Sequence, residues 1–227
     1  MSLILSIETS TPLCSVALHR SGELLASQET QEEGGHGKKL TRLIESCCSM
    51  AGISLQQLDA IAVSNGPGSY TGLRIGLATA KGLCFGLDIP LITMNTLQVM
   101  ANAWSGLPEN TLLLPMLDAR RMEVYAAVFD GKSKVTMTET HPIVLESTSF
   151  ESLNQPSIAF GNGALKWKDT CKNPHISFSE EHPFPHAKFM GIDAASDFAE
   201  KKFASLALTE PAYLKEFMGT KPKIKSL

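Results

Sequence analysis

Short apolar runs separated by polar turns fill the beginning of the chain. An apolar run at residues 3–7 ends at Glu8, and alternating segments at 14–19 and 23–31 follow it, joined by a turn at Gly22. Alternation with a period of two around a glycine turn is typical of a β-hairpin. The pattern therefore predicts a buried strand with a hairpin beside it.

Apolar residues then recur at helical spacing. In residues 38–51 they fall on one face of a predicted amphipathic helix: Leu40, Leu43, Ile44, Cys47 and Met50. A buried strand at 60–64, a glycine-rich turn at 65–68 and a helix from Ser69 or Thr71 to about Gly86 follow. A strand at 90–93 and a helix from Asn95 or Thr96 to about Ala103 complete the first half.

The second half repeats this order in shortened form. A strand at 112–117 ends in Asp118, and segments at 124–129 and 135–140 form a second hairpin around Gly131. The run at 158–163 repeats the pattern at 61–66, whereas residues 147–155 leave room for only a short helix. A final amphipathic helix is expected from about Pro185 or Ala187 to Ala204.

The duplication predicts the fold class. Two copies of strand, hairpin, helix, strand and turn indicate an α/β protein with the actin-like ATPase fold, made of two ribonuclease-H-like lobes with the second reduced. We expect an N-terminal lobe at residues 1–105 and a smaller C-terminal lobe at 106–227. The last helix is expected to pack back on the first lobe.

Polar loops at the strand ends are the candidate nucleotide-facing positions. They comprise Glu8, Thr9, Ser10, Gly66, Gly68, Asp118, Gly161 and Gly163. A strand, a glycine turn and a helix N-terminus form an anion site because free backbone N–H groups point outward there. The turn matches neither the dinucleotide nor the P-loop pattern, so a purely structural turn remains an alternative. The carboxylates of Glu8 and Asp118 could equally cap strand ends or pair with Arg121 or Arg74.

Small residues form a stripe on the helix that follows the turn. Gly72, Gly76 and Ala80 recur every four residues. A glycine inside a helix costs about 1 kcal/mol relative to alanine, so the stripe predicts the close approach of another backbone. The approaching segment could belong to this chain or to another one.

Composition narrows the function classes. The net charge of −3 argues against nucleic-acid binding by this chain alone, and a solvated terminus explains the basic residues Lys221, Lys223 and Lys225. Without a basic leader or a long apolar run, the expected location is the cytoplasm, with no membrane contact. The five cysteines lack metal-ligand spacing and suggest free thiols.

The sequence offers no catalytic or metal-binding constellation. Pro183 and Pro185 break the helix that would align His182 with His186, and Ser69 lacks a nucleophile-elbow pattern. We therefore predict no catalytic residue and no metal ligand.

Four blocks of the sequence resemble the TsaB (YeaZ) family. They are residues 4–11, residues 66–83, residues 118–125 with Asp118 and Arg121, and residues 161–164. The resemblance implies a cytoplasmic protein of the actin-like fold that takes part in forming threonylcarbamoyladenosine at position 37 of ANN-decoding tRNAs. It also implies a TsaD-type catalytic subunit and a TsaE-type ATPase as partners, with tRNA contacted only through the complex.

One departure from the related catalytic subunit bears on activity. That subunit carries an H-x-x-x-H metal pair after the glycine block, where this chain has Thr96 and Met100. A hydroxyl and a thioether make a poor site for a hard metal. The chain is therefore expected to be non-catalytic, with ATP or ADP and magnesium possible only at the level of the complex.

These expectations place a partner interface on two helices. Its predicted residues are His36, Leu40, Leu43, Tyr70, Gly72, Leu73, Arg74, Gly76, Leu77 and Ala80, and a homodimer through the same face is expected when the partner is missing. The alternatives are an ATP-binding or ATP-hydrolysing enzyme that uses Glu8, Thr9 and Asp118, and a metallopeptidase.

Overall fold

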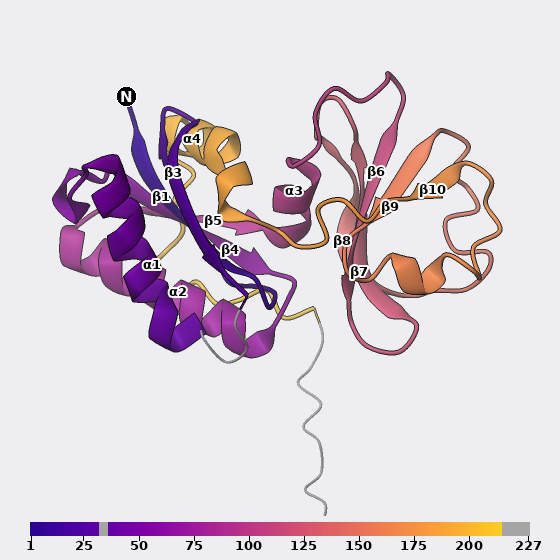
Figure 1. Cartoon of the computed structure of the whole chain (residues 1–227), viewed down its shortest axis with the longest axis horizontal. Helices are drawn as coiled ribbons and strands as arrows, with labels where there is room; N and C mark the ends of the chain where they lie inside the picture. The colour runs from indigo at the N-terminus through magenta and orange to yellow at the C-terminus, as the bar shows by residue number, and fades with distance from the viewer. Residues whose placement is uncertain (32–35, 215–227) are drawn as a thin grey trace, which may run out of the picture.

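Two five-stranded sheets lie side by side in the computed structural model, which describes residues 1–31 and 36–214 (Figure 1). The first sheet has the order β3-β2-β1-β4-β5. Its strands are β1 (Leu3–Glu8), β2 (Cys14–Arg20), β3 (Glu23–Thr30), β4 (Ala60–Gly66) and β5 (Leu91–Asn95). The second sheet has the order β10-β9-β6-β7-β8. Its strands are β6 (Leu112–Asp118), β7 (Glu123–Asp130), β8 (Thr136–Val144), β9 (Ser157–Phe160) and β10 (Ile176–Phe178).

The two sheets share one topology. In the first, β1 pairs antiparallel with β2 and parallel with β4; in the second, β6 pairs antiparallel with β7 and parallel with β9. The outer strands β3 and β8 continue the antiparallel side, and β5 and β10 continue the parallel side. The predicted duplicated, actin-like α/β fold is confirmed.

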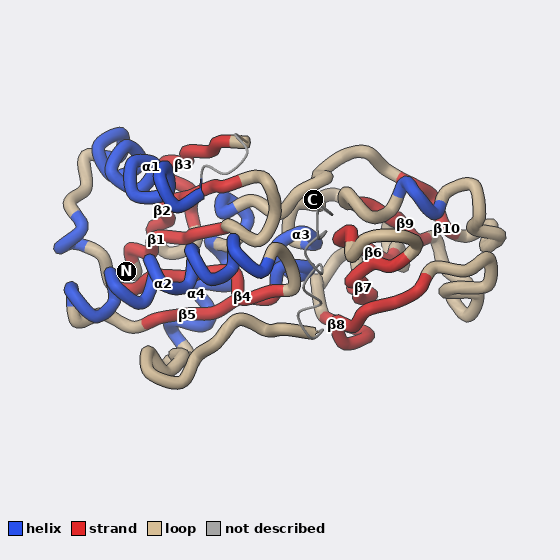
Figure 2. Tube along the Cα trace, turned by 90° about the horizontal axis from the view of Figure 1, so that it is seen from below, coloured by secondary structure: helices blue, strands red, loops and turns tan. Residues whose placement is uncertain are grey.

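The first sheet is buried on both faces. α1 (His36–Ala51) and α2 (Tyr70–Leu87) run beside each other across one face (Figure 2). Leu5 and Ile61, neighbours in the sheet register, point into the core under these helices. Ile4 and Ala62 point to the opposite face, where α4 (Gly191–Ala199) and a short 3₁₀ helix η3 (Ala187–Phe189) cover them. Apolar runs without alternation are what such a doubly covered sheet requires.

The second lobe replaces its long helices with turns. Residues 147–155 form turns, so the short helix expected there is absent. Trp167, in a 3₁₀ helix η2 (Leu165–Trp167), is fully buried and fills the core instead. α3 (Thr96–Ala101) lies between the lobes and contacts strands of both sheets (Figure 1). It ends two residues before the predicted Ala103.

The chain returns to the first lobe near its C-terminus. α4 contacts β1, β2, β3 and β5 of the first sheet. It ends at Ala199 rather than at the predicted Ala204, and Lys201 just beyond it adopts a left-handed φ of 56°, which stops the helix. Within the described residues, no helix has the length and apolarity needed to cross a bilayer.

Candidate functional site

The carboxyl ends of β1 and β4 meet at the N-terminus of α2. There the Ser69 N–H donates to the Ser10 carbonyl at 2.6 Å, and the Ser69 hydroxyl caps the helix by accepting from the Gly72 N–H. Ser10 also donates its own N–H to the Glu8 carboxylate at 2.6 Å. An amide of the glycine turn that would face a phosphate in an anion site is therefore bonded to the chain itself.

The glycines of α2 receive the loop after β1. A Cβ on Gly72 would lie 2.1 Å from the Thr9 carbonyl oxygen, and one on Gly76 would lie 2.2 Å from the Thr9 hydroxyl oxygen. That hydroxyl donates to the Gly72 carbonyl at 2.8 Å. The close approach that the stripe predicted exists, and the approaching segment belongs to this chain.

This contact corrects the interface prediction. The following predicted interface residues are buried within the chain: Leu40, Gly72, Leu73, Gly76, Leu77 and Ala80. They pack into the core, so they offer no surface to a partner. Leu43 and Tyr70 are half-buried and Arg74 is exposed, whereas the side chain of His36 falls outside the described residues.

Other residues of the two helices do face outward. Ala78, Gly82 and Gly86 form an exposed small-residue row on α2, and a Cβ on either glycine would have nothing within 4 Å. Phe85, next to them, is 84% exposed. We call these four residues the outer α2 row. Ala78, Gly82 and Gly86 recur every four residues, as Gly72, Gly76 and Ala80 do, so the sequence spacing could have predicted this row as well.

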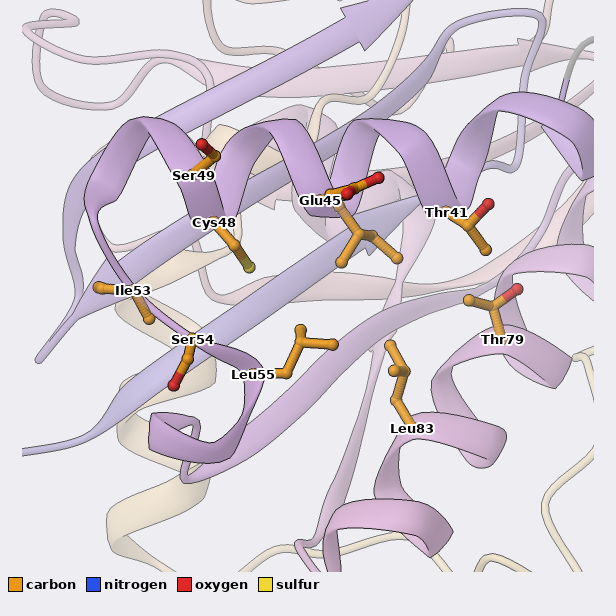
Figure 3. A pocket seen from close by; sticks show the side chains of 10 residues that line it. Thr41, Glu45, Cys48, Ser49, Ile53, Ser54, Leu55, Thr79 and Leu83 are labelled. Carbon is orange, nitrogen blue, oxygen red and sulfur yellow. The ribbon is translucent and has the colours of Figure 1, made fainter.

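An apolar groove of about 400 Å³ separates α1 from α2. Figure 3 shows Leu55 and Leu83 pointing into it, with Thr41 and Thr79 toward one end. The rest of its lining comes from α1 and the segment after it: Ile44, Glu45, Cys48, Ser49, Ile53 and Ser54. The outward side of these helices therefore carries two apolar features, the outer α2 row and the groove beside it.

Glu8 is a fully buried carboxyl group. Burial raises its pKa, and the hydroxyls of Ser10 and Ser64 and the amides of the loop oppose this increase only in part. Among the described residues no lysine or arginine is buried, so no cationic side chain accompanies Glu8 in the core. A raised pKa favours the protonated carboxyl, which binds metals and positively charged groups less well than the carboxylate does.

Unpartnered oxygens gather around Glu8 at the ends of β1, β4 and β5. Within the described part of the chain, buried oxygens there that form no hydrogen bond of good geometry are Glu8 Oε2, Ser10 Oγ, Thr11 Oγ1, Ser64 Oγ, Asn65 Oδ1 and Thr96 Oγ1. The hydroxyls of Ser10 and Ser64 thus lie near enough to Glu8 to oppose the rise of its pKa without forming a hydrogen bond of good geometry with it. Hydroxyls can both donate and accept hydrogen bonds, and ordered water satisfies such groups in protein interiors. Sequence reasoning missed Ser64, although it is a polar residue near the end of an apolar strand.

The corresponding site in the second lobe is also internally paired. Asp118 forms an ion pair with Lys166 and accepts from the Arg120 N–H at 3.0 Å, so neither Arg121 nor Arg74 is its partner. Cβ atoms on Gly161 and Gly163 would lie 2.5 Å from the Met116 carbonyl oxygen and 2.9 Å from the Asp118 nitrogen, respectively. These two glycines admit the backbone of β6.

The residues at the metal-pair positions of the related subunit lie in the core. Met100 is fully buried and reaches Gly161, and Thr96 is fully buried at the start of α3. In residues 1–31 and 36–214, no three histidine, cysteine or acidic side chains are grouped as metal ligands. The hydroxyl and the thioether that stand at these two positions are a poor ligand pair for a hard metal ion.

Buried thiols supply no nucleophile. Burial raises the pKa of Cys14 to about 12 and the pKa values of Cys47 and Cys84 to about 11. Thiolate is the reactive form, so these side chains are inert at neutral pH.

The fold and the site define a class: a two-lobed actin-like protein whose ligand-facing turns are filled by its own chain. Residues 24–227 match the family model for TsaD, the tRNA N6-adenosine threonylcarbamoyltransferase. The chain is 32% identical over 224 residues to the tRNA threonylcarbamoyladenosine biosynthesis protein TsaB of Escherichia coli K12, covering 96% of both chains. It is 39% identical over 122 residues to TsaB of Haemophilus influenzae, covering 54% of this chain and 51% of that one. The chain belongs to the TsaB family.

Solved structures agree with this assignment. YeaZ from Pseudomonas aeruginosa superposes with a TM-score of 0.78 at 26% identity, covering 94% of this chain and 100% of that one. A second structure, of a protein described as similar to peptidase YeaZ from Pseudomonas aeruginosa, gives 0.80 at 25% identity, with 95% and 100% covered.

Proposed function

We propose that this chain is a non-catalytic subunit that pairs with a TsaD-type threonylcarbamoyltransferase and supports formation of threonylcarbamoyladenosine at position 37 of ANN-decoding tRNAs. The observation that carries the proposal is the filled turn at α2, where the Ser69 N–H bonds to the Ser10 carbonyl. The protein keeps the architecture of a ligand-binding fold while using its turns for internal contacts. A role in tRNA modification is consistent with the predicted cytoplasmic location.

The pairing surface is the outward side of α1 and α2. A match to the transferase's own family model supports a partner of the same fold, with equivalent helices. Two related folds can meet through equivalent helix pairs in a pseudo-twofold arrangement, which also permits a homodimer when the partner is missing. The exposed Phe85 and the apolar groove supply the aromatic anchor and pocket typical of such an interface.

Nucleotide and tRNA belong to the assembled complex in this proposal. The buried position of Glu8, whose pKa is raised by burial, and the Asp118–Lys166 ion pair favour ATP or ADP with magnesium binding elsewhere, on a TsaE-type ATPase or at the transferase. The net charge of −3 favours tRNA contact through the other subunits.

Co-purification with a TsaD-type partner tests the pairing surface. Phe85→Glu is expected to reduce recovery of the pair at least about tenfold, because it buries a charge in an apolar interface. Ile192→Glu is the matched control, since Ile192 is 78% exposed on α4, on the opposite face of the sheet. Equal recovery of both variants and the wild type would refute the surface.

The alternative of an ATP-using enzyme has a separate test. Calorimetry of the isolated chain with magnesium–ATP is expected to give no saturable heat. Saturable binding that is lost in Glu8→Gln would favour the enzyme, and zinc-dependent peptide cleavage by the metal-supplemented chain would favour the peptidase.

A further inference from the structure

A strap formed by residues 204–214 returns from α4 to the glycine turn (Figure 1, yellow). At its beginning, the Ala204 N–H donates to the Leu91 carbonyl of β5 at 2.8 Å. Near its end, the Ala212 N–H donates to the Asn65 carbonyl at 2.7 Å, and the Ala212 carbonyl oxygen lies 2.9 Å from where a Cβ on Gly66 would stand. The strap thus covers the turn between β4 and α2.

Tyr213 fastens the strap to the first turns of α2. Its ring lies 4.9 Å from the Tyr70 ring, and its hydroxyl accepts a hydrogen bond from Arg74 Nε at 2.8 Å. The Arg74 guanidinium lies 4.0 Å from the centre of the Tyr70 ring. A cation over an aromatic face that is also held by a hydrogen bond has a fixed orientation.

Arg74 is exposed on α2. No carboxylate within the described residues forms an ion pair with it. It lies on α2 one turn before Ala78, where the outer α2 row begins. Tyrosine and arginine are the residues that most often anchor interfaces, and an oriented guanidinium matches a carboxylate through two parallel hydrogen bonds.

We propose that the docked strap is part of the partner-binding surface, with Tyr213 holding Arg74 ready for a carboxylate of the partner subunit. The inference rests on the proposed pairing through α1 and α2 and adds the chemistry of one end of that surface. Pairing and strap docking are then linked, because the partner binds the strapped conformation most tightly. Tyr213 is a positioning residue and Arg74 is the contact residue.

Affinity measurements with the full chain and a TsaD-type partner test the proposal. Tyr213→Ala is expected to weaken pairing about tenfold and Tyr213→Phe about threefold, because phenylalanine keeps the stacking and loses only the hydrogen bond. Leu208→Ala is the control on the same strap, since Leu208 is 82% exposed, and it should change the affinity less than twofold. Thermal unfolding of each variant checks that the fold persists.

A second measurement distinguishes a specific loss of Arg74 positioning from a general loosening of the fold. In the wild type, pairing should slow hydrogen exchange at the Ala212 amide of the strap, and in Tyr213→Ala this slowing should be lost while α2 remains protected. Wild-type affinity in Tyr213→Ala overturns the strap proposal and leaves the proposed pairing intact. A wild-type chain that does not pair at all overturns both.

Discussion

Thr9 explains why α2 has glycine at positions 72 and 76. Its carbonyl and hydroxyl oxygens occupy the space that side chains at positions 72 and 76 would need, and its hydroxyl bonds the Gly72 carbonyl. The sequence spacing correctly predicted a close approach on this face of the helix. It could not identify the approaching segment, because a four-residue stripe carries no information about which chain lies against it.

Paired glycine variants on α2 separate the inner stripe from the outer row. Gly76→Ala should destabilise the chain by about 1–3 kcal/mol, because the added methyl group meets Thr9 in a packed site. Gly82→Ala should stabilise it by up to about 1 kcal/mol, because its methyl group enters open space and alanine favours the helix. Urea unfolding measures both changes. Equal effects of the two substitutions would contradict this division.

The buried carboxyl of Glu8 gives a pH-dependent prediction. Because its folded pKa lies above the ordinary value of 4.5, its stabilising contribution is complete below that value and is lost as the pH rises through the folded pKa. Glu8→Gln removes this loss and should be at least about 1 kcal/mol more stable than the wild type at pH 8. The gain should shrink toward pH 4.

Chemical unfolding at the two pH values measures this gain. Glu180→Gln, at an exposed position, is the control and should show no such pH-dependent gain. A Glu8→Gln variant that is less stable than the wild type by the same amount at both pH values would show that Glu8 is a charged structural group.

At the scale of elements, periodicity predicted most strands and both long helices. The hairpins, α1 and α2 appear where alternation or helical spacing indicated them, since each has one consistent buried face. The short helix expected at 147–155 is absent, and turns there place Phe150 against the buried Trp167 instead. Packing of this kind joins residues that are distant in the sequence, so it leaves no local pattern from which it could be predicted.

The return segment η3 is attached to the first sheet through two buried histidines. His19 contacts Ser6 and the Lys188 carbonyl, and His186 pairs with Glu29 at 2.5 Å. Burial lowers the pKa values of both histidines, although Glu29 partly opposes the shift at His186 and Lys188 adds to it.

This attachment should weaken in acid. Histidines whose folded pKa is lowered contribute stability that is complete above about 6.5 and is lost as the pH falls through the folded values. In the Glu8→Gln background, which removes the opposite pH dependence of Glu8, the melting temperature should therefore decrease between pH 7.5 and 5.5, and exchange of the Ala187 amide, which donates to the Ser15 hydroxyl, should accelerate. His19→Gln should reduce this pH dependence, and an unchanged dependence in that variant would contradict the assignment.

At the scale of the whole molecule, two lobes retain a duplicated fold while their turns contact their own chain. The sequence predicted this architecture and the absence of the histidine pair, because both follow from order and residue type along the chain. Which helix face remains open, and how residues 204–214 reach the glycine turn, depend on contacts between distant segments. The exposed surface of α1 and α2 is the one that we propose for partner binding.

The most direct test of the account is reconstituted threonylcarbamoyladenosine formation with a TsaD-type transferase and a TsaE-type ATPase. The chain alone should give no product, its addition should activate the transferase, and Phe85→Glu should lose that activation while Glu8→Gln and Ile192→Glu keep it. Product formed by the chain alone, or activation lost in Glu8→Gln and kept in Phe85→Glu, would contradict a non-catalytic subunit that acts through its outer helical face.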